Sequence, residues 1–296
     1  MGEALVLSSS VLLALSTVFA HYLTKGLDPL VIVFYSFLLS FLFFNFTGLR
    51  NKGVISLIKN NWKWVVFVNI TTALDWLLIF IALKYISAAL INCFVFGLAP
   101  IATLLLTYKN YPSRRAFVKD LVICCLISLL LICLSIVYYQ NNNGITNLSA
   151  TNILWGILFS SISGLATGAT IYGCKKLQIV GFSTNSVMRS RFIAIIIMAI
   201  LLLKFNQASL ALDIGTSTDI VLLTFIFVII PTFLLQKGIE RTLPIMTTII
   251  TSLIPVLTYL FQFLEPDFIF DLKEIMIITV LSCVVIISTI HKKLLK

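Results

Sequence analysis

Long apolar stretches alternate along the chain with short segments that carry charged and turn-forming residues. A helix needs about 20 predominantly apolar residues to cross the hydrocarbon core of a bilayer. Ten stretches approach that length, at residues 4–24, 29–49, 64–83, 87–108, 121–139, 152–174, 181–203, 220–236, 243–264 and 275–291. The pattern therefore predicts an all-α integral membrane protein with ten transmembrane helices.

The fifth and sixth stretches are joined by a segment that has no charge but is too polar for hydrocarbon. It reads QNNNGITNLSATN over residues 140–152 and is rich in residues that favour turns. We therefore predict a connecting loop over 142–151, which divides the chain into two halves, 1–141 and 152–296. Each half then holds five helices.

Composition supports a membrane protein and excludes other classes. Of the 296 residues, 60% are hydrophobic and 11% are charged, and the mean hydropathy is +1.09. Soluble domains have about 45–50% apolar and about 25% charged residues, so this chain could not cover its surface with polar groups. The composition excludes a cytosolic enzyme and a nucleic-acid-binding protein, and it indicates a multi-pass protein of the cell (inner) membrane.

The distribution of basic residues predicts the orientation of the helices. When the N-terminus is placed inside, 15 Lys and Arg residues fall on the inner side and four on the outer side. Lys and Arg are enriched in cytoplasmic loops. Both termini are therefore expected in the cytoplasm.

Cysteine and histidine residues form no metal or catalytic motif. All six cysteines lie inside apolar stretches without Cys-x-x-Cys spacing, and His21 and His291 lie near opposite ends of the chain. The sequence contains no His-Glu-x-x-His or Gly-x-Ser-x-Gly motif. We therefore predict no metal, no cofactor and no enzymatic activity. An intramembrane enzyme, or a non-transporting scramblase or sensor, is kept as an alternative of another class.

The two halves of the chain contain an internal repeat. A shift of 155 residues aligns ALKYISAALINCFVFGLAPIATLLL, from Ala82, with KGIERTLPIMTTIITSLIPVLTYLF, from Lys237, and places Pro100 on Pro255 without a gap. Because each copy has an odd number of helices, the second copy enters the membrane in the opposite orientation. Inverted repeats of this kind are typical of secondary transporters that work by alternating access.

These features resemble those of a known family. The two five-helix halves, the paired segments from Ala82 and Lys237, and a Trp155-Gly156 step in the sixth stretch are similar to the EamA-type permeases of the drug/metabolite transporter (DMT) superfamily. The resemblance covers nearly the whole chain. It implies an EamA-like repeat in each half, a central cavity and movement of small metabolites without ATP.

Two residues of opposite charge lie near the middle of predicted helices. Asp75 falls inside the third stretch, and Arg191 lies about ten residues into the seventh, roughly 15 Å along the helix axis. Such residues are costly in a bilayer and often mark substrate or proton pathways. We predict that Asp75, with the adjacent Trp76 as an aromatic wall, and Arg191 bind substrate or a coupling ion. The alternative is that the two charges pair with each other. Arg189, nearer the cytoplasm, is a secondary candidate and alternatively an anchor at that face.

Three prolines interrupt predicted helices, namely Pro100, Pro231 and Pro255. A proline inside a helix leaves the carbonyl four residues earlier without its usual partner. The freed carbonyls are those of Phe96, Phe227 and Thr251. We predict gating or helix-breaking roles for these prolines, with tolerated kinks as the alternative.

Small and polar residues mark three further helices. Asn92, Thr247 and Thr251 add polar groups to the fourth and ninth stretches, and the shift of 155 residues places Asn92 on Thr247. We include them in the predicted site, although Asn and Thr also bond across membrane helices for packing alone. Gly164 and Gly168 are spaced to let the sixth helix approach a neighbour closely.

The function predicted from these features is secondary transport of a small polar metabolite. Opposite charges at Asp75 and Arg191 would suit an amino acid or another zwitterion. If the two charges pair with each other, efflux of drug-like amphiphiles is the alternative. The expected partners are a small-molecule substrate and the lipid bilayer, with protons as a candidate coupling ion and a homodimer left open.

Overall fold

The computed structural model describes residues 1–24, 26–47, 54–111, 113–142, 150–207, 210, 212–264 and 272–294, and every regular element among them is helical. In chain order the elements are α1 (Gly2–Thr24), α2 (Pro29–Thr47), α3 (Val54–Asn60), α4 (Trp62–Ala82), α5 (Ala88–Thr107), η1 (Tyr108–Asn110), α6 (Arg114–Asn142), α7 (Ala150–Ile179), α8 (Thr184–Ser190), α9 (Ile193–Phe205), α10 (Ile214–Leu222), η2 (Leu223–Ile229), α11 (Ile230–Arg241), α12 (Pro244–Thr251), α13 (Ile254–Phe261), η3 (Gln262–Leu264) and α14 (Leu272–Leu294).

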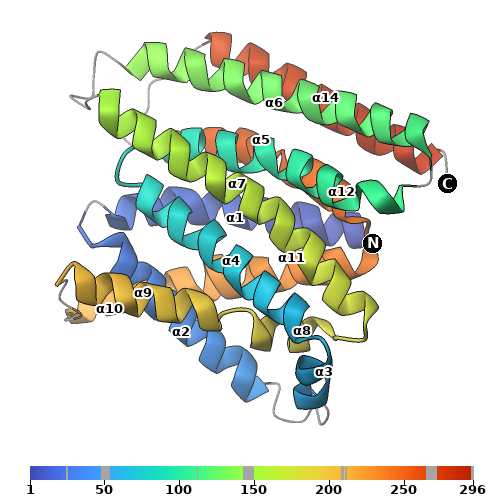
Figure 1. The fold of residues 1–296 in the computed structure, drawn as a ribbon. Helices are drawn as coiled ribbons and strands as arrows, with labels where there is room; N and C mark the ends of the chain where they lie inside the picture. Colours follow the sequence, from blue (N-terminus) through green and yellow to red (C-terminus); the bar gives the residue numbers. More distant parts are fainter. Residues whose placement is uncertain are drawn as a thin grey trace.

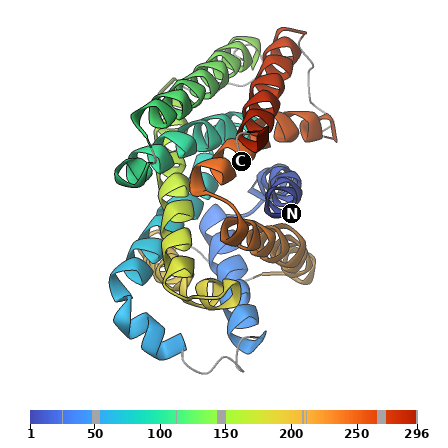
Figure 2. The same ribbon diagram turned by 90° about the vertical axis from the view of Figure 1, so that its right-hand side faces the viewer.

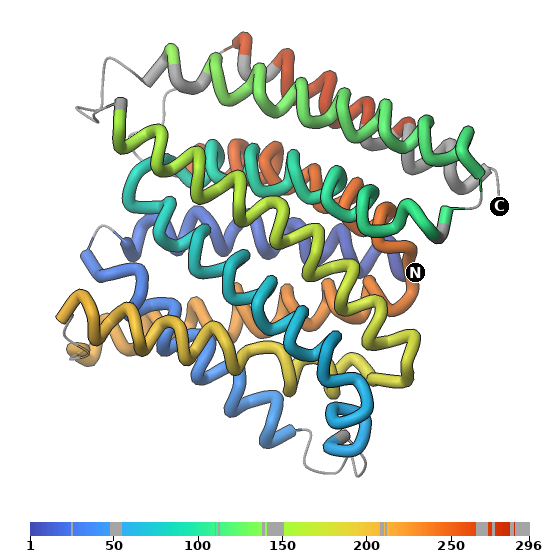
Figure 3. The backbone as a smooth tube through the Cα atoms, in the orientation of Figure 1, coloured from blue at the N-terminus to red at the C-terminus, as the bar shows by residue number. Residues whose placement is uncertain are grey.

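The long helices form one bundle. Helices α6 and α14 lie side by side at one edge, and α2, α9 and α10 lie at the opposite edge (Figures 1 and 2). Between them α7 packs against both α4 and α5, while α1 packs against α11, α12 and α13. The start of α1 lies beside the end of α11, at one end of the bundle (Figure 3). Helices from the two predicted halves therefore contact one another throughout the centre.

Nine of the predicted transmembrane stretches are confirmed as candidate spans. Within the described residues, nine helical segments are long and apolar enough to cross a bilayer, and they run from Gly2–Thr24 to Pro244–Leu264. The tenth stretch, 275–291, lies within α14, which is not among the nine, so its crossing remains a prediction. Most of the predicted connecting loop, at residues 143–149, lies outside the described residues.

The observed helices extend beyond the apolar stretches where these meet basic residues. Helix α6 begins at Arg114 instead of residue 121, and α7 continues past Lys175 to Ile179. Long basic side chains can keep their charge in water while their stems pack on a helix, so charges at a helix end do not stop it. The short helix α3 was not predicted.

Three of the confirmed spans are irregular. The seventh is broken at Arg191 and Phe192, between α8 and α9, and the ninth at Ser252 and Leu253, between α12 and α13. The eighth contains a π-helical segment, η2, before Pro231. Apolar periodicity predicted each of these spans as one continuous helix.

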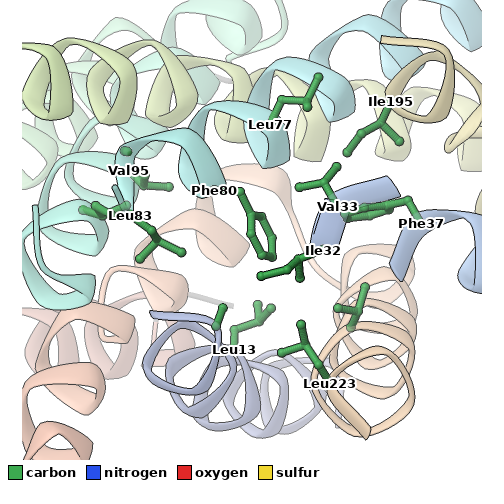
Figure 4. Close-up of a cluster of buried hydrophobic side chains, with 14 of the residues drawn as sticks. Leu13, Ile32, Val33, Phe37, Leu77, Phe80, Leu83, Val95, Ile195 and Leu223 are labelled. Carbon is green, nitrogen blue, oxygen red and sulfur yellow. The ribbon is translucent and has the colours of Figure 1, made fainter. Parts of the chain in front are cut away.

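Apolar side chains fill the centre of the bundle between α1, α2, α4 and η2. Leu13, Ile32, Phe80 and Leu223 come from these four elements and meet there, and each is at most 8% exposed (Figure 4). The region where the resemblance implies a cavity is thus packed with hydrocarbon in the described conformation.

Two glycines of α7 allow the close approach to α5 that their spacing predicted. A Cβ atom at Gly164 would lie 2.7 Å from the carbonyl oxygen of Val95, and one at Gly168 would lie 2.3 Å from that of Ala99. Because both obstacles are backbone atoms, neither can move aside easily. The predicted packing role of Gly164 and Gly168 is confirmed.

Candidate functional site

Asp75 lies on the face of α4 that packs against α7. Its side chain is buried and its carboxylate is held by neutral hydroxyl groups. Thr167 Oγ1 donates to Asp75 Oδ1 at 2.5 Å, and Ser163 Oγ lies 3.3 Å from the same oxygen and 2.9 Å from the Asp75 carbonyl oxygen. Ser163 and Thr167 are one turn apart, so both project from one side of α7. The second oxygen, Oδ2, accepts no hydrogen bond from the described residues.

Arg191 lies at the break between α8 and α9, and it is 4% exposed. Its Nη1 atom is 3.4 Å from Gln236 Oε1 on α11, 4.0 Å from Cys174 Sγ on α7 and 3.9 Å from Met188 Sδ. These contacts are an amide oxygen at long range and two sulfur atoms. The guanidinium charge therefore has weak neutral acceptors and no carboxylate in direct contact.

Asp75 and Arg191 lie close enough to interact electrostatically, but they form no ion pair within 4.0 Å. Their contact residues on α7, Thr167 and Cys174, are seven residues apart, which corresponds to roughly 10 Å along the helix. The two charges therefore share one face of α7 at different depths.

The break beside Arg191 is held together by Asn69 of α4. Asn69 Nδ2 donates to the Ser190 carbonyl at 2.5 Å and to the Val65 carbonyl at 2.9 Å. Asn69 Oδ1 accepts from the backbone N–H groups of Ile193, at 3.1 Å, and Ala194, at 3.2 Å. One amide thus joins the last carbonyl of α8 to the first N–H groups of α9, and all four of its hydrogen-bonding positions are used.

Sequence reasoning missed the role of Asn69. The available signal was an Asn inside the apolar stretch 64–83, where a strongly polar side chain requires a partner. Its partner could not be identified because the residues at the break, Arg191 and Phe192, include neither Pro nor Gly.

Pro100 lies within α5, opposite the break in the ninth span. The carbonyl of Phe96, four residues earlier, accepts from Ser252 Oγ at 3.2 Å, and that hydroxyl also lies 2.9 Å from the Thr248 carbonyl. Ser128 on α6 donates to the neighbouring Gly97 carbonyl at 2.7 Å. The irregular parts of the fourth and ninth spans are therefore in contact.

Pro255 lies at a helix start, whereas Pro231 lies inside the eighth span, directly after the π-helical segment η2. Pro255 is in the first turn of α13, directly after the break at Ser252 and Leu253. Pro231 is in the first turn of α11, and its carbonyl accepts from Ser9 Oγ of α1 at 2.7 Å. The position of Pro255 suits proline, because the first N–H groups of a helix have no partner within it.

The polar residues of the fourth and ninth spans do not come together at one point. Asn92 Nδ2 donates to Thr258 Oγ1 at 2.7 Å, and Thr247 exchanges a hydrogen bond with Thr242 at 2.7 Å. Thr251 Oγ1 donates to the Thr248 carbonyl at 3.0 Å. These contacts favour packing roles, and none of them joins Asp75 or Arg191.

Trp76 and Arg189 lie to one side of the two buried charges. The Trp76 ring packs edge-on against Phe37 of α2, with ring centroids 5.2 Å apart. Arg189 Nε donates to Asn45 Oδ1 near the end of α2, at 3.4 Å. Within the described ranges, no cluster of three His, Cys, Asp or Glu side chains could hold a metal ion.

The fold and these buried charges define a multi-pass helical membrane protein. Residues 1–109 match the model of the EamA-like transporter family. Over these residues, which are less than half of the chain, the protein is similar to that family.

The fold is shared with a solved protein structure. A crystal structure described only as "Crystal structure of protein" superposes with a TM-score of 0.74 and 16% sequence identity, over 99% of this chain and 98% of that chain. Among curated proteins, none matches the sequence.

Proposed function

We propose that this chain is a secondary transporter of small polar metabolites that works by alternating access, with Asp75 as the charge that binds substrate or a coupling proton. In this proposal the chain has ten transmembrane helices in two inverted EamA-like repeats, 1–141 and 152–296, with both termini in the cytoplasm. Amino acids and other zwitterions are the favoured substrates.

The observation that carries the proposal is the environment of Asp75. A carboxylate at the bilayer centre costs about 2.5 to 3.5 kcal/mol on insertion scales. Ser163 and Thr167 supply hydrogen bonds to one oxygen but no positive charge, and no cationic side chain of the described residues lies within 4.0 Å. A structural carboxylate would be expected to have a direct counter-ion. One that lacks it can exchange a proton or a substrate cation.

The irregular helices support alternating access. Transporter sites are often built from discontinuous helices near the interface of the two repeats. Here α8 and α9 are joined through Asn69 of the first half, and the break after α12 contacts the Phe96 carbonyl of the first half. Each of these two breaks in the second half is therefore bonded to a polar group of the first half. A movement of one half relative to the other would change these hydrogen bonds.

An amphiphile efflux protein is the second candidate. Phe37, Trp76 and Phe80 form a chain of aromatic contacts beside the apolar core, with centroids 5.2 and 6.4 Å apart. Such a surface would suit flat apolar substrates if the centre opened. This function needs no role for Asp75 in binding.

The test is transport by purified protein in liposomes, using a panel of labelled amino acids and a lipophilic cation dye. We expect uptake of at least one amino acid, and we expect Asp75→Asn to abolish it while inserting normally. Unchanged amino acid transport by Asp75→Asn would contradict the role of Asp75, and transport of the dye alone would favour the second candidate.

Asp120 offers a matched control for this experiment. It is buried to nearly the same degree, at 8% against 7% exposed, and it lies on α6, where Tyr111 donates to its carboxylate. Burial and the Asp120 carboxylate raise the pKa of Tyr111 well above its ordinary value, so this hydroxyl stays protonated and keeps donating. Asp120→Asn removes a buried carboxylate away from α7 and should leave transport unchanged.

A further inference from the structure

Buried polar atoms without partners gather around Arg191. Among the described residues, Arg191 Nε has no hydrogen-bond partner, and neither has Nε2 of Gln236, whose side chain is fully buried. The two side chains are in contact through Arg191 Nη1 and Gln236 Oε1, at 3.4 Å. Buried polar groups in proteins are nearly always hydrogen-bonded. Two unused donors on touching side chains therefore point to an absent acceptor.

The positive charge of Arg191 also points to an absent acceptor. An arginine guanidinium remains protonated in proteins, and a buried charge without a partner is strongly unfavourable. The groups around Arg191 are the Gln236 amide oxygen, the sulfur atoms of Cys174 and Met188, and the Phe192 ring, whose centroid lies 5.3 Å from the guanidinium carbon. None of these carries a negative charge that balances the guanidinium. Asp75 interacts with Arg191 electrostatically but is not in contact with it.

We propose that Arg191 and Gln236 form a binding site for a small carboxylate, supplied by the acid group of the transported metabolite. A guanidinium presents parallel donors that match a carboxylate, and the free amide nitrogen of Gln236 adds another donor. This inference rests on the proposed function and specifies its substrate class.

The placement of Asp75 is compatible with an anion at Arg191. Thr167, a hydroxyl partner of Asp75, lies about 10 Å along α7 from Cys174, which contacts the guanidinium. A carboxylate bound on the Gln236 side of Arg191 is therefore kept apart from the Asp75 carboxylate. The other end of a zwitterionic metabolite could extend toward Asp75.

Access to this site requires movement, because both Arg191 and Gln236 are nearly or fully buried. Arg191 lies at the break between α8 and α9, where the backbone is held by the side chain of Asn69 and not by continuous helical hydrogen bonds. The site is thus placed on a segment that can change its geometry without unwinding a helix.

The binding test uses the purified full-length protein in detergent and follows its thermal unfolding in sodium acetate, in sodium chloride at equal ionic strength and in acetamide. We expect acetate to raise the unfolding temperature with saturation, and acetamide, which has the same shape without the charge, to have no effect. Equal stabilisation by chloride would assign the site to inorganic anions and overturn the carboxylate assignment. Absence of any specific effect of acetate would also overturn it.

Single substitutions test whether the acetate stabilisation comes from Arg191 and Gln236. Arg191→Gln should remove the acetate stabilisation, and Gln236→Leu should raise the apparent Kd for acetate at least severalfold. Arg189→Gln removes a cation two residues away that is bonded to Asn45, and it should behave like the wild type. If Arg191→Gln does not fold, Gln236→Leu and Arg191→Lys decide the matter, because unchanged acetate binding in both would contradict the site.

Failure of this inference can be separated from failure of the proposed function. Transport in liposomes that depends on Asp75 but is confined to uncharged or cationic metabolites would reject the carboxylate site and keep the transporter. Specific acetate binding at Arg191 without transport of any metabolite would support the site and reject the transporter.

Discussion

The four hydrogen bonds of Asn69 predict that Asn69→Ala destabilises the protein more than removal of any other single amide named above. The substitution leaves the Ser190 carbonyl and the N–H groups of Ile193 and Ala194 without the amide that joins them. These are end groups of α8 and α9, which have no partner within their own helices. The bond to the Ser190 carbonyl is buried, and the bonds to the two N–H groups are partly buried.

The expected loss follows from the number of bonds. Side-chain hydrogen bonds between membrane helices contribute about 0.6 kcal/mol each on average, so four bonds give roughly 2.4 kcal/mol. Counted instead as unsatisfied donors, at about 1 to 3 kcal/mol each, the two freed N–H groups give about 2 to 6 kcal/mol, so we expect a loss of at least about 2 kcal/mol. Asn92→Ala is the matched control, because Asn92 is also buried, at 1% exposed against 8% for Asn69, but within the described residues it donates only to Thr258. Its expected loss is about 0.6 kcal/mol.

Two measurements check this prediction. Unfolding of the purified variants by sodium dodecyl sulfate in mixed micelles gives the difference in free energy of unfolding. Hydrogen exchange should show faster exchange at Ile193 and Ala194 in Asn69→Ala, with little change in the same amides of Asn92→Ala. Equal losses of stability in the two variants, or unchanged protection at the break, would refute the reasoning that Asn69 holds α8 and α9 together.

Two further predictions concern packing and charge. Gly168→Ala should lose about 1 to 3 kcal/mol of stability, because the new Cβ would lie 2.3 Å from the Ala99 carbonyl oxygen. Gly26→Ala is the control and should be nearly neutral in the same unfolding assay, because no atom lies within 4 Å of its new Cβ. Equal effects of the two substitutions would contradict the close contact of α5 and α7. Asp75 and Arg191 form no direct ion pair. The double variant Asp75→Asn, Arg191→Gln should therefore not regain the stability that each single variant loses. Recovery of the wild-type free energy of unfolding in a double-mutant cycle would show that the two residues pair.

The apolar pattern was sufficient to place the spans because a bilayer imposes one length on every crossing helix. Nine stretches became candidate spans, and the main differences lie at ends such as Arg114 and Lys175, where basic side chains allow a helix to continue into the interface. The packing of α7 on α5 was also accessible, because small residues one turn apart have few other uses in a membrane helix. Both results depend on local properties of the sequence.

The candidate site was only partly accessible from sequence. Asp75 and Arg191 could be selected because charges in apolar stretches are conspicuous. Their partners Ser163, Thr167 and Gln236 could not, because hydroxyl and amide side chains are common in membrane helices and their pairing depends on how helices distant in sequence are packed. The predicted association of Asn92 with the site illustrates the same limit, since its amide bonds to Thr258 on the ninth span instead.

The broken helices show why a local reading cannot find such sites. Pro255 predicts an irregularity in the ninth span from the sequence alone, because proline cannot donate the usual helical hydrogen bond. The seventh span breaks at Arg191 without any such residue, and what compensates the lost helical bonds is an amide 121 residues away, at Asn69. A break stabilised from another helix depends on the contact between those helices, so a movement that separates α4 from α8 and α9 would remove the support of the break. Arg191 lies at that point, so the same movement that opens the bundle would also free the guanidinium to bind or release an anion.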